Sequence, residues 1–415
     1  MIARIPRLLA ALALLGAATP GTPAATPGTP ATAHGTPAAT PATPAATLGS
    51  PATAESPRNA GPIVRATPDV TVTFDGTIHA MAYEGDRIYL GGDFTHAIDR
   101  GRLVVRTRLA ALDARTGRLL PWNPSADGRV RALAATDTAV VIGGDFGTVN
   151  GVSRDNLARL DPETGAVGAF RHTVYGHPHA IAIGPDRVYV GGTLTQVDGQ
   201  PRRNVAAFDL ATGALDPQWK PNAQAAVDAL VVAGDRVFLG GAFTKIDEVR
   251  GSARIAVVDA RSGSVRPGFS TTIGYAVSSL SLSNGTLYAA VGGRGGRAVA
   301  LDASTGRTRW IATADGDVEA VVRVGDMVFM GGHFDHICAS NQVGDKGVCR
   351  TGSTVRIKIA ALDLSGRLLP WLADANGIMG VETMAISPEL GKLAAGGSFT
   401  EINGAAQRRF AQFQR

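Results

Sequence analysis

The chain has 415 residues, of which 45% are apolar and 18% are charged, and it contains 52 glycines but only two cysteines. This composition permits a large hydrophobic core, and abundant glycine with few charges is typical of an all-β fold with many tight turns. The formal net charge is +5, and the arginines recur at similar places along the chain instead of gathering in one cluster, so we expect no nucleic-acid partner.

Residues 1–18 are predicted to form a secretory signal peptide. Arg4 and Arg7 make its positive end, and Leu8–Ala18 is an apolar run that ends in small residues. The run is too short to cross a bilayer and Pro20 follows it closely, so we expect no membrane span. A buried N-terminal helix is the alternative. The prediction is a secreted, extracellular protein.

Residues 19–62 are almost entirely Ala, Thr, Pro and Gly, and no Lys, Arg, Asp or Glu occurs between Leu8 and Ala54. Such a segment buries too little apolar surface to offset its ordering entropy. It is therefore predicted to be a disordered, semi-extended linker, and its Thr/Pro-rich composition is compatible with O-glycosylation.

A Gly-Gly pair that follows an apolar run recurs through the rest of the chain. The pairs are Gly91–Gly92, Gly143–Gly144, Gly191–Gly192, Gly240–Gly241, Gly292–Gly293, Gly331–Gly332 and Gly396–Gly397. Each copy holds four short β signals separated by turn residues, and no helical period interrupts them. Four strands in a repeat of roughly fifty residues are typical of a propeller blade, whereas a β-solenoid has shorter repeats with fewer turns.

The predicted fold is therefore an all-β, seven-bladed β-propeller of four-stranded antiparallel blades, spanning residues 68–415. The last copy stops after its third strand, and Pro68–Gly76 aligns with Pro121–Gly128, which follows a third strand in the first copy. We expect this N-terminal strand to complete the last blade, because pairing the two ends removes an open sheet edge.

Two kinds of repeated residue receive a structural interpretation. An Asp in the L-D-x-x-T-G turn recurs in six of the seven copies, one per blade, which separates the carboxylates and predicts turn formation, not a metal cluster. The tryptophans fall on fourth strands, where we expect them to pack one blade on the next instead of forming a sugar pocket. They are Trp122, Trp219, Trp310 and Trp371.

The candidate site lies on the first strand of each copy. In the pattern V-x-A-L, such as Val130–Leu133, the x position is polar in every copy while the strand is otherwise apolar. First strands line the channel of a propeller, so these residues should form one ring: His79, Arg131, His179, Asp228, Ser278, Glu319 and Glu382. The ring is either a site for a small ligand or cation, or a water-filled, charge-balanced tunnel. His177 and His179 together with His79 could suggest zinc, but residues of blades one and three are expected to lie too far apart to share an ion, so no metal site is claimed.

Cys338 and Cys349 lie in the longest insertion, between the second and third strands of the sixth copy. A pair of cysteines within one loop of an exported protein predicts a disulfide, with free thiols or metal ligands as the alternatives. The chain contains neither G-x-S-x-G nor H-E-x-x-H. No catalytic residue is therefore assigned.

The motif G-G-x-F-[TG]-x-[IV]-[DN]-G, followed by an Arg, occurs at Gly143–Gly151 with Arg154 and at Gly396–Gly404 with Arg408. It resembles the delta-sixty-repeat propellers of secreted bacterial proteins, a likeness that implies a fold and a secreted setting but no assigned reaction. Ala300–Trp310 is similar to the outer-strand tryptophan motif of pyrroloquinoline-quinone propellers. Those enzymes usually have eight blades and adjacent paired cysteines over the cofactor, which this chain lacks, so no cofactor is expected.

These features favour a monomeric, non-enzymatic binding or scaffolding propeller for an extracellular ligand, whether protein, glycan or small molecule. Its long second-to-third-strand loops are expected to be irregular and to offer a binding surface on one face. The alternative is an extracellular hydrolase or oxidoreductase at the channel mouth. Two carboxylates or a His–carboxylate pair at catalytic distance would distinguish the two, and the residues available are His79, His179, Asp228, Glu319 and Glu382.

Overall fold

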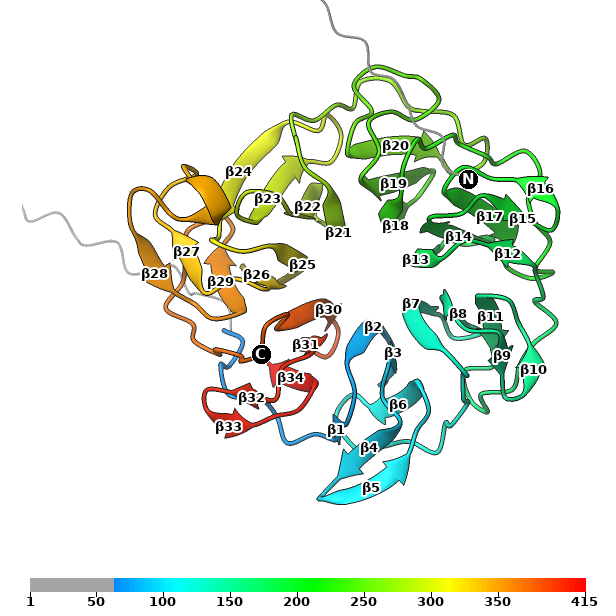
Figure 1. Ribbon diagram of the computed structural model, residues 1–415, viewed down its shortest axis with the longest axis horizontal. Coiled ribbons are helices and arrows are strands. Elements are labelled where there is room, and N and C mark those ends of the chain that lie inside the picture. The colour runs from blue at the N-terminus through cyan, green and yellow to red at the C-terminus, as the bar shows by residue number, and fades with distance from the viewer. Residues whose placement is uncertain (1–62) are drawn as a thin grey trace, which may run out of the picture. The chain divides into compact units, whose positions relative to one another are not determined.

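The computed structural model describes residues 63–415. The predicted signal peptide (1–18) and linker (19–62) lie outside the described residues. The described part is a β-propeller in which antiparallel sheets radiate from a central axis (Figure 1). No helix within residues 63–415 is long and apolar enough to cross a membrane.

Seven sheets of three or four strands, here called blades one to seven in chain order, form the ring. Their inner strands are β2 (Ile78–Glu84), β7 (Arg129–Ala135), β13 (Pro178–Ile183), β18 (Val227–Ala233), β21 (Val277–Ser283), β25 (Val318–Val324) and β30 (Val381–Ser387). Their second strands are β3 (Arg87–Gly92), β8 (Val140–Asp145), β14 (Arg187–Gly192), β19 (Arg236–Gly241), β22 (Thr286–Val291), β26 (Met327–Gly332) and β31 (Lys392–Gly397). Their third strands are β6 (Leu109–Asp113), β11 (Leu157–Leu160), β17 (Val205–Asp209), β20 (Ile255–Asp259), β23 (Arg297–Asp302), β29 (Ile359–Asp363) and β34 (Phe410–Gln414). Each inner strand contacts the inner strands of both neighbours, and β30 contacts β2, so the ring is closed.

The fourth strands are shorter than predicted. Only blade five has a long one, β24 (Thr308–Thr313), whereas blades one, two, three, four and six keep a single bridge in its place, such as Leu112 with Leu119. In four of those five blades a proline stands two residues after the bridged residue. Proline has no N–H to continue the ladder, which ends the strand there. The prolines are Pro121, Pro217, Pro267 and Pro370.

The loops between second and third strands are hairpins, which corrects the expectation of irregular loops. The x-[DN]-G part of the motif makes a two-residue turn with positive φ at both positions, 49° at Asn150 and 73° at Gly151, as a type I′ hairpin requires. The hairpins are β4–β5 (His96–Asp99, Arg102–Val105), β9–β10 (Thr148–Val149, Val152–Ser153), β15–β16 (Gln196–Val197, Gln200–Pro201), β27–β28 (His336–Cys338, Ser353–Val355) and β32–β33 (Glu401–Ile402, Ala405–Ala406).

Each hairpin ties its blade to the preceding one. Its first arm pairs with the chain that leaves the preceding blade, as β4 pairs with β1 (Thr73–Phe74) and β15 with β12 (Val174–Tyr175). Single bridges do the same elsewhere, for example Ala126 with Val149. Among the described blades, blade five alone lacks a strand or bridge in this place, because residues 292–296 connect β22 directly to β23.

The blades pack through glycines and aromatic rings. A Cβ on Gly91 would lie 2.5 Å from Cγ1 of Val130 on the next inner strand, so the first glycine of the pair lets adjacent blades approach. In blade five the two positions of the second strand that correspond to the Gly-Gly pair are Ala290 and Val291. This corrects the assignment of Gly292–Gly293 as the equivalent pair.

The tryptophans link consecutive blades, as predicted. Trp122 donates its indole N–H to the carbonyl of Asp161 at 3.0 Å, and Trp219 donates to Asp259 at 3.1 Å. Each acceptor lies in or directly after the third strand of the next blade. The repeated Asp also has the predicted role, since Asp113 accepts the backbone N–H and the hydroxyl of Thr116 at 2.7 and 2.8 Å.

The N-terminal segment closes blade seven. Arg65 and Asp69 donate backbone N–H groups to Gln414 and Gln412 of β34, at 2.9 and 2.7 Å. The segment that pairs as a fourth strand therefore begins upstream of the predicted Pro68–Gly76, and the later residues Thr73–Phe74 join the blade-one hairpin instead. The ammonium of Lys392, buried to 4% exposure, meets the carboxylate of Asp69 at 2.6 Å and fixes this joint.

Candidate functional site

Every residue of the predicted ring is the extra residue of a β-bulge. In blade one Ile78 lies opposite Gly92 and Ala80 opposite Gly91, which leaves His79 without a partner on the second strand. The same shift occurs in all seven inner strands. A bulge re-aims a side chain. Here it directs a polar residue into the channel from a strand whose neighbours pack between blades.

The seven side chains line one cavity of about 450 Å³. Ala276, Val277, Gly292, Asp317 and Met379 complete its wall. The ring is therefore a single polar surface, and its members differ in how their charges are compensated.

At the joint between blades seven and one, His79 bridges two carboxylates. Its Nδ1 lies 3.0 Å from Glu382 and its Nε2 lies 2.9 Å from Asp93. Burial alone would lower the pKa of His79, but the hydrogen bonds and charges of Glu382 and Asp93 outweigh it and raise that pKa above its ordinary value. Arg129 adds a second cation to Asp93 at 2.9 Å. These groups form a charge-compensated cluster.

The charges of blades two, three and four are also paired. Asp145 accepts Arg131 on one oxygen and His177 on the other, both at 2.7 Å, and His179 bonds Asp228 at 2.7 Å. Burial acts to raise the pKa of Asp145, but Arg131 and His177 lower it overall. His79 and Glu382 are therefore in contact across the closure of the ring, whereas Arg131 bonds Asp145 and not the neighbouring ring residue His179.

Blade six differs because its carboxylates have no cationic partner. Neither Asp317 nor Glu319 forms an ion pair with any Lys, Arg or His within the described residues. Asp317 accepts the backbone N–H of Gly293 at 3.1 Å. Burial, followed by the charge of Asp317, raises the pKa of Glu319, while the charge of nearby His333 and a hydrogen bond from Ser278 act in the opposite direction without reversing the shift. The cavity thus has excess negative charge at blade six.

Blade five provides the space beside these carboxylates. It presents Ala276, Ser278 and Gly292 to the cavity, all of them small. The Ser278 hydroxyl is 3.1 Å from the carbonyl of Val318, to which it donates. The missing hairpin of blade five leaves this part of the rim without the cover that the other blades have.

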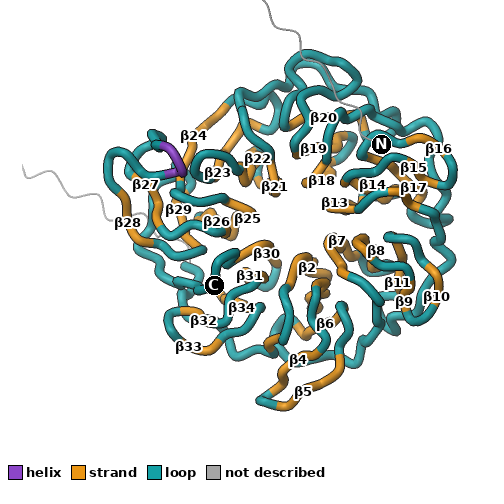
Figure 2. Tube along the Cα trace, viewed as in Figure 1, coloured by secondary structure: helices purple, strands orange, loops and turns teal. Residues whose placement is uncertain are grey.

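The insertion of blade six fills part of that gap. Figure 2 shows its single helical turn, η1 (Asp345–Gly347), in the loop between β27 and β28. Arg294 of the short blade-five turn meets Asp345 at 3.3 Å. A Cβ on Gly347, whose φ is 82°, would lie 2.2 Å from the carbonyl oxygen of Asp315, so only glycine fits there. The longest and shortest connections of the ring therefore pack against each other.

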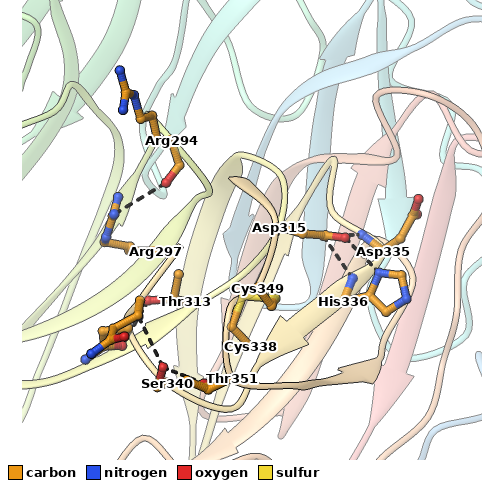
Figure 3. The surroundings of a disulfide bond; sticks show 12 residues. Arg294, Arg297, Thr313, Asp315, Asp335, His336, Cys338, Ser340, Cys349 and Thr351 are labelled. Atoms are coloured by element: carbon orange, nitrogen blue, oxygen red, sulfur yellow. Dashed lines mark hydrogen bonds and ion pairs between the residues drawn. A yellow bond between two sulfur atoms is a disulfide. The ribbon is translucent and has the colours of Figure 1, made fainter. Parts of the chain in front are cut away.

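The predicted disulfide is present between Cys338 and Cys349, with a Cα–Cα distance of 5.2 Å. Figure 3 shows it in this insertion, near a Ser340–Thr351 hydrogen bond of 2.7 Å. The bond closes the loop that packs on blade five. Both cysteines are in the disulfide, so neither is a free thiol.

Sequence reasoning missed the partners of the ring. Asp93 and Asp145 directly follow their Gly-Gly pairs, while Arg129, His177 and Asp317 stand two residues before their ring positions. These two positions, one after the Gly-Gly pair and one two residues before the ring residue, recur in every blade, and this recurrence could have identified the partners. This signal is weak because several blades have Ala, Gly or Ser at these positions, so no repeated polar pattern appears.

The site has His–carboxylate pairs, and the Ser278 hydroxyl in the wall of the same cavity donates to the carbonyl of Val318. His79 has carboxylates on both ring nitrogens, so it has no free position to act as a base. His179 bonds Asp228 through Nδ1, and its Nε2 forms no hydrogen bond within residues 63–415. No group of three or more His, Cys, Asp or Glu residues in the described chain is arranged to hold a metal ion.

A family model described as "Outer membrane protein assembly factor BamB" matches residues 66–289 and 251–350. The chain belongs to this family. The match supports the likeness to pyrroloquinoline-quinone-type propeller repeats, while the delta-sixty likeness remains a resemblance in sequence. No curated protein sequence matches the chain.

Two solved structures were compared with this BamB-family chain, and the first supports its fold. The WD40 β-propeller domain of Doa1 superposes with a TM-score of 0.54 at 10% identity, covering 85% of this chain and 97% of that chain. The computationally designed protein Ika8 has a TM-score of 0.48 at 18% identity, covering 84% of this chain and 100% of that one. The likeness to the Doa1 domain shows a propeller fold alone.

Proposed function

We propose that this BamB-family chain is a secreted, non-enzymatic binding propeller that takes a cationic group of its ligand at the channel mouth. The observation that carries the proposal is the uneven pairing of the ring. Asp228 and Glu382 line the cavity and each has a basic partner, as do Asp93 and Asp145 next to the ring, whereas Asp317 and Glu319 line the same cavity without an ion pair. An ammonium or guanidinium between them would relieve their mutual repulsion.

Burial and space support the same site. Isolated carboxylates are costly to bury, and a charge-balanced tunnel would compensate them within the chain, as blades one and two do. The small residues of blade five leave room for a ligand group beside Glu319. A cation that enters from solvent supplies the compensation that the protein lacks.

The test uses agmatine, a small guanidinium amine, in titration calorimetry with the full chain. We expect binding that Asp317→Asn with Glu319→Gln weakens at least about tenfold, since a charge-assisted contact is lost. Ser278→Lys should weaken it similarly by placing a chain cation beside Glu319. Asp235→Asn, an exposed carboxylate outside the cavity, is the control and should leave binding unchanged. Equal affinities in all four proteins would contradict the proposal.

A catalytic role has one specific observation in its favour, the His179–Asp228 pair. Asp228 orients the imidazole, and Nε2 is placed to accept a proton from water, so general-base hydrolysis is the second candidate. Turnover of chromogenic esters or glycosides that disappears in His179→Asn would establish it. The binding role instead requires agmatine affinity without turnover.

The proposal of export rests on residues 1–18 and on a disulfide, which persists in oxidising compartments. Sequencing the N-terminus of protein collected from the medium tests it. Chains that begin after Ala18 or a nearby small residue are the expected result, whereas an intact Met1 in cell extract alone would contradict it.

A further inference from the structure

Exposed apolar side chains lie on both sides of the acidic part of the channel mouth. Tyr275 is 40% exposed in the loop that enters blade five, and Ile378 and Met379 are 83% and 47% exposed in the loop that enters blade seven. Blade six, with Asp317 and Glu319, lies between these loops (Figure 1). Met379 also lines the central cavity.

Two further hollows adjoin that cavity. One, of about 460 Å³, is lined by Tyr275, Arg294 and Lys346 and shares Asp317 with the central cavity. The other, of about 540 Å³, is lined by Ile378 and the Asp335–Lys358 pair. The two side hollows meet at Asp315, Gly316 and His333. The mouth is therefore a continuous depression that crosses blade six, and a lone small cation would fill only its centre.

Most charged groups of the side hollows are paired, but Lys346, which lines the Tyr275 hollow, and His333, which lines both hollows, form no ion pair within residues 63–415. Lys358 neutralises Asp335 at 2.8 Å, and Arg294 is paired with Asp345 at 3.3 Å. Asp315 accepts two backbone N–H groups and lies 2.7 Å from the His336 ring. The Tyr275 ring is held under the guanidinium of Arg297, 5.3 Å from the ring centre. The carboxylates without an ion pair are thus central and exposed apolar surface is at the flanks, while Lys346 adds a positive charge on the Tyr275 side.

We infer that the ligand is an extended polypeptide segment of a partner protein, with a basic side chain between two apolar ones. In an extended chain, residues two apart project to the same side about 7 Å from each other. A basic residue can then enter the cavity toward Asp317 and Glu319 while its apolar neighbours at the second position on either side cover Tyr275 and Ile378. This inference rests on the proposed function, because it assigns the cationic group to a peptide.

The experiment measures calorimetric affinities of the full chain for agmatine and for three blocked pentapeptides. Their sequences are Leu-Ala-Arg-Ala-Leu, Ala-Ala-Arg-Ala-Ala and Leu-Ala-Glu-Ala-Leu. We expect the first peptide to bind at least about tenfold more tightly than the second, because its leucines bury apolar surface. The third should not bind, because its carboxylate meets Asp317 and Glu319.

Two variants test which side chains give the leucine peptide its higher affinity. Ile378→Ser and Tyr275→Ser should each remove much of the advantage of the leucine peptide and leave agmatine binding unchanged. Val70→Ser changes a side chain that is 94% exposed outside the three hollows and serves as the matched control. If agmatine binds but both arginine peptides have equal affinity, the peptide inference is wrong and the proposed function stands. If agmatine and all the peptides fail to bind, the proposed function itself is wrong.

Discussion

The two sides of the channel mouth are built from the same repeat and differ in chemistry. Around blades seven, one and two, carboxylates and cations alternate, with His79 held between Glu382 and Asp93. Around blades five and six, small side chains face Asp317 and Glu319, which have no cationic partner in the part of the chain that the structure describes. One side stabilises the ring, whereas the other carries unfavourable charge that a ligand can compensate. Function is therefore expected where pairing is incomplete.

The largest effect should follow from opening the ring on its paired side. Deleting Val64–Gly76 removes buried Val72 and Phe74, exposes the edge of β34 and leaves Lys392 without Asp69. We expect loss of the cooperative thermal transition and aggregation. Deleting residues 19–57 is the control and should leave the melting temperature nearly unchanged. Equal effects of the two deletions would contradict the closure by residues 65–69.

Removing the disulfide tests the rim of the channel mouth at blades five and six. The bond joins residues separated by 11 positions, for which the chain-entropy model gives about 3 kcal/mol. Cys338→Ser with Cys349→Ser should therefore increase amide exchange in the insertion and beside it in blade five. Exchange in the β4–β5 hairpin should not change. An unaltered insertion would show that contacts such as Arg294–Asp345 hold it without the bond.

Breaking the His79 bridge should cost about 2 kcal/mol of unfolding free energy, because two half-buried carboxylates lose their shared partner. The pKa of His79 is raised in the folded chain above the ordinary 6.5. Its contribution is therefore complete below that value and is lost as the pH rises through the folded pKa. Urea unfolding of His79→Leu should show a deficit that is largest at acidic pH and shrinks toward alkaline pH. A loss of unfolding free energy that grows with pH would contradict a raised pKa of His79 in the folded chain.

The smallest expected effect is an increase in unfolding free energy when Glu319 is replaced by Gln. Burial and Asp317 raise the pKa of Glu319, so the folded chain is destabilised by the ionised carboxylate at neutral pH. Glu319→Gln should raise the unfolding free energy by less than about 1 kcal/mol, with no gain at a pH below the unfolded pKa. Agmatine affinity of the unsubstituted chain should fall as the pH drops through the raised pKa. A destabilised Glu319→Gln protein would indicate that the carboxylate has an internal partner.

Much of the fold and of the ring could be predicted from the repeats in the sequence. The Gly-Gly pairs, the V-x-A-L strands and the turn aspartates predicted the blades, because each feature recurs at a fixed offset. The ring residues were found for the same reason, and the structure shows that they are bulge residues. The predictions of the fourth strands and of the blade-five glycine pair were less accurate. Proline ends most of the fourth strands early, and the shortened connection of blade five moves its Gly-Gly pair out of the strand register.

Which charges are compensated was decided by the tertiary structure. The sequence alone determined that seven polar residues face one channel and that Cys338 and Cys349 share a loop. It did not determine that Asp93 and Asp145 bind the cations of blades one and two while Asp317 and Glu319 have none. An ion pair requires atoms within about 4 Å, a distance set by how each bulge turns its side chain against the next blade. Repeat spacing specifies the strand, and the packing of neighbouring blades specifies the partner.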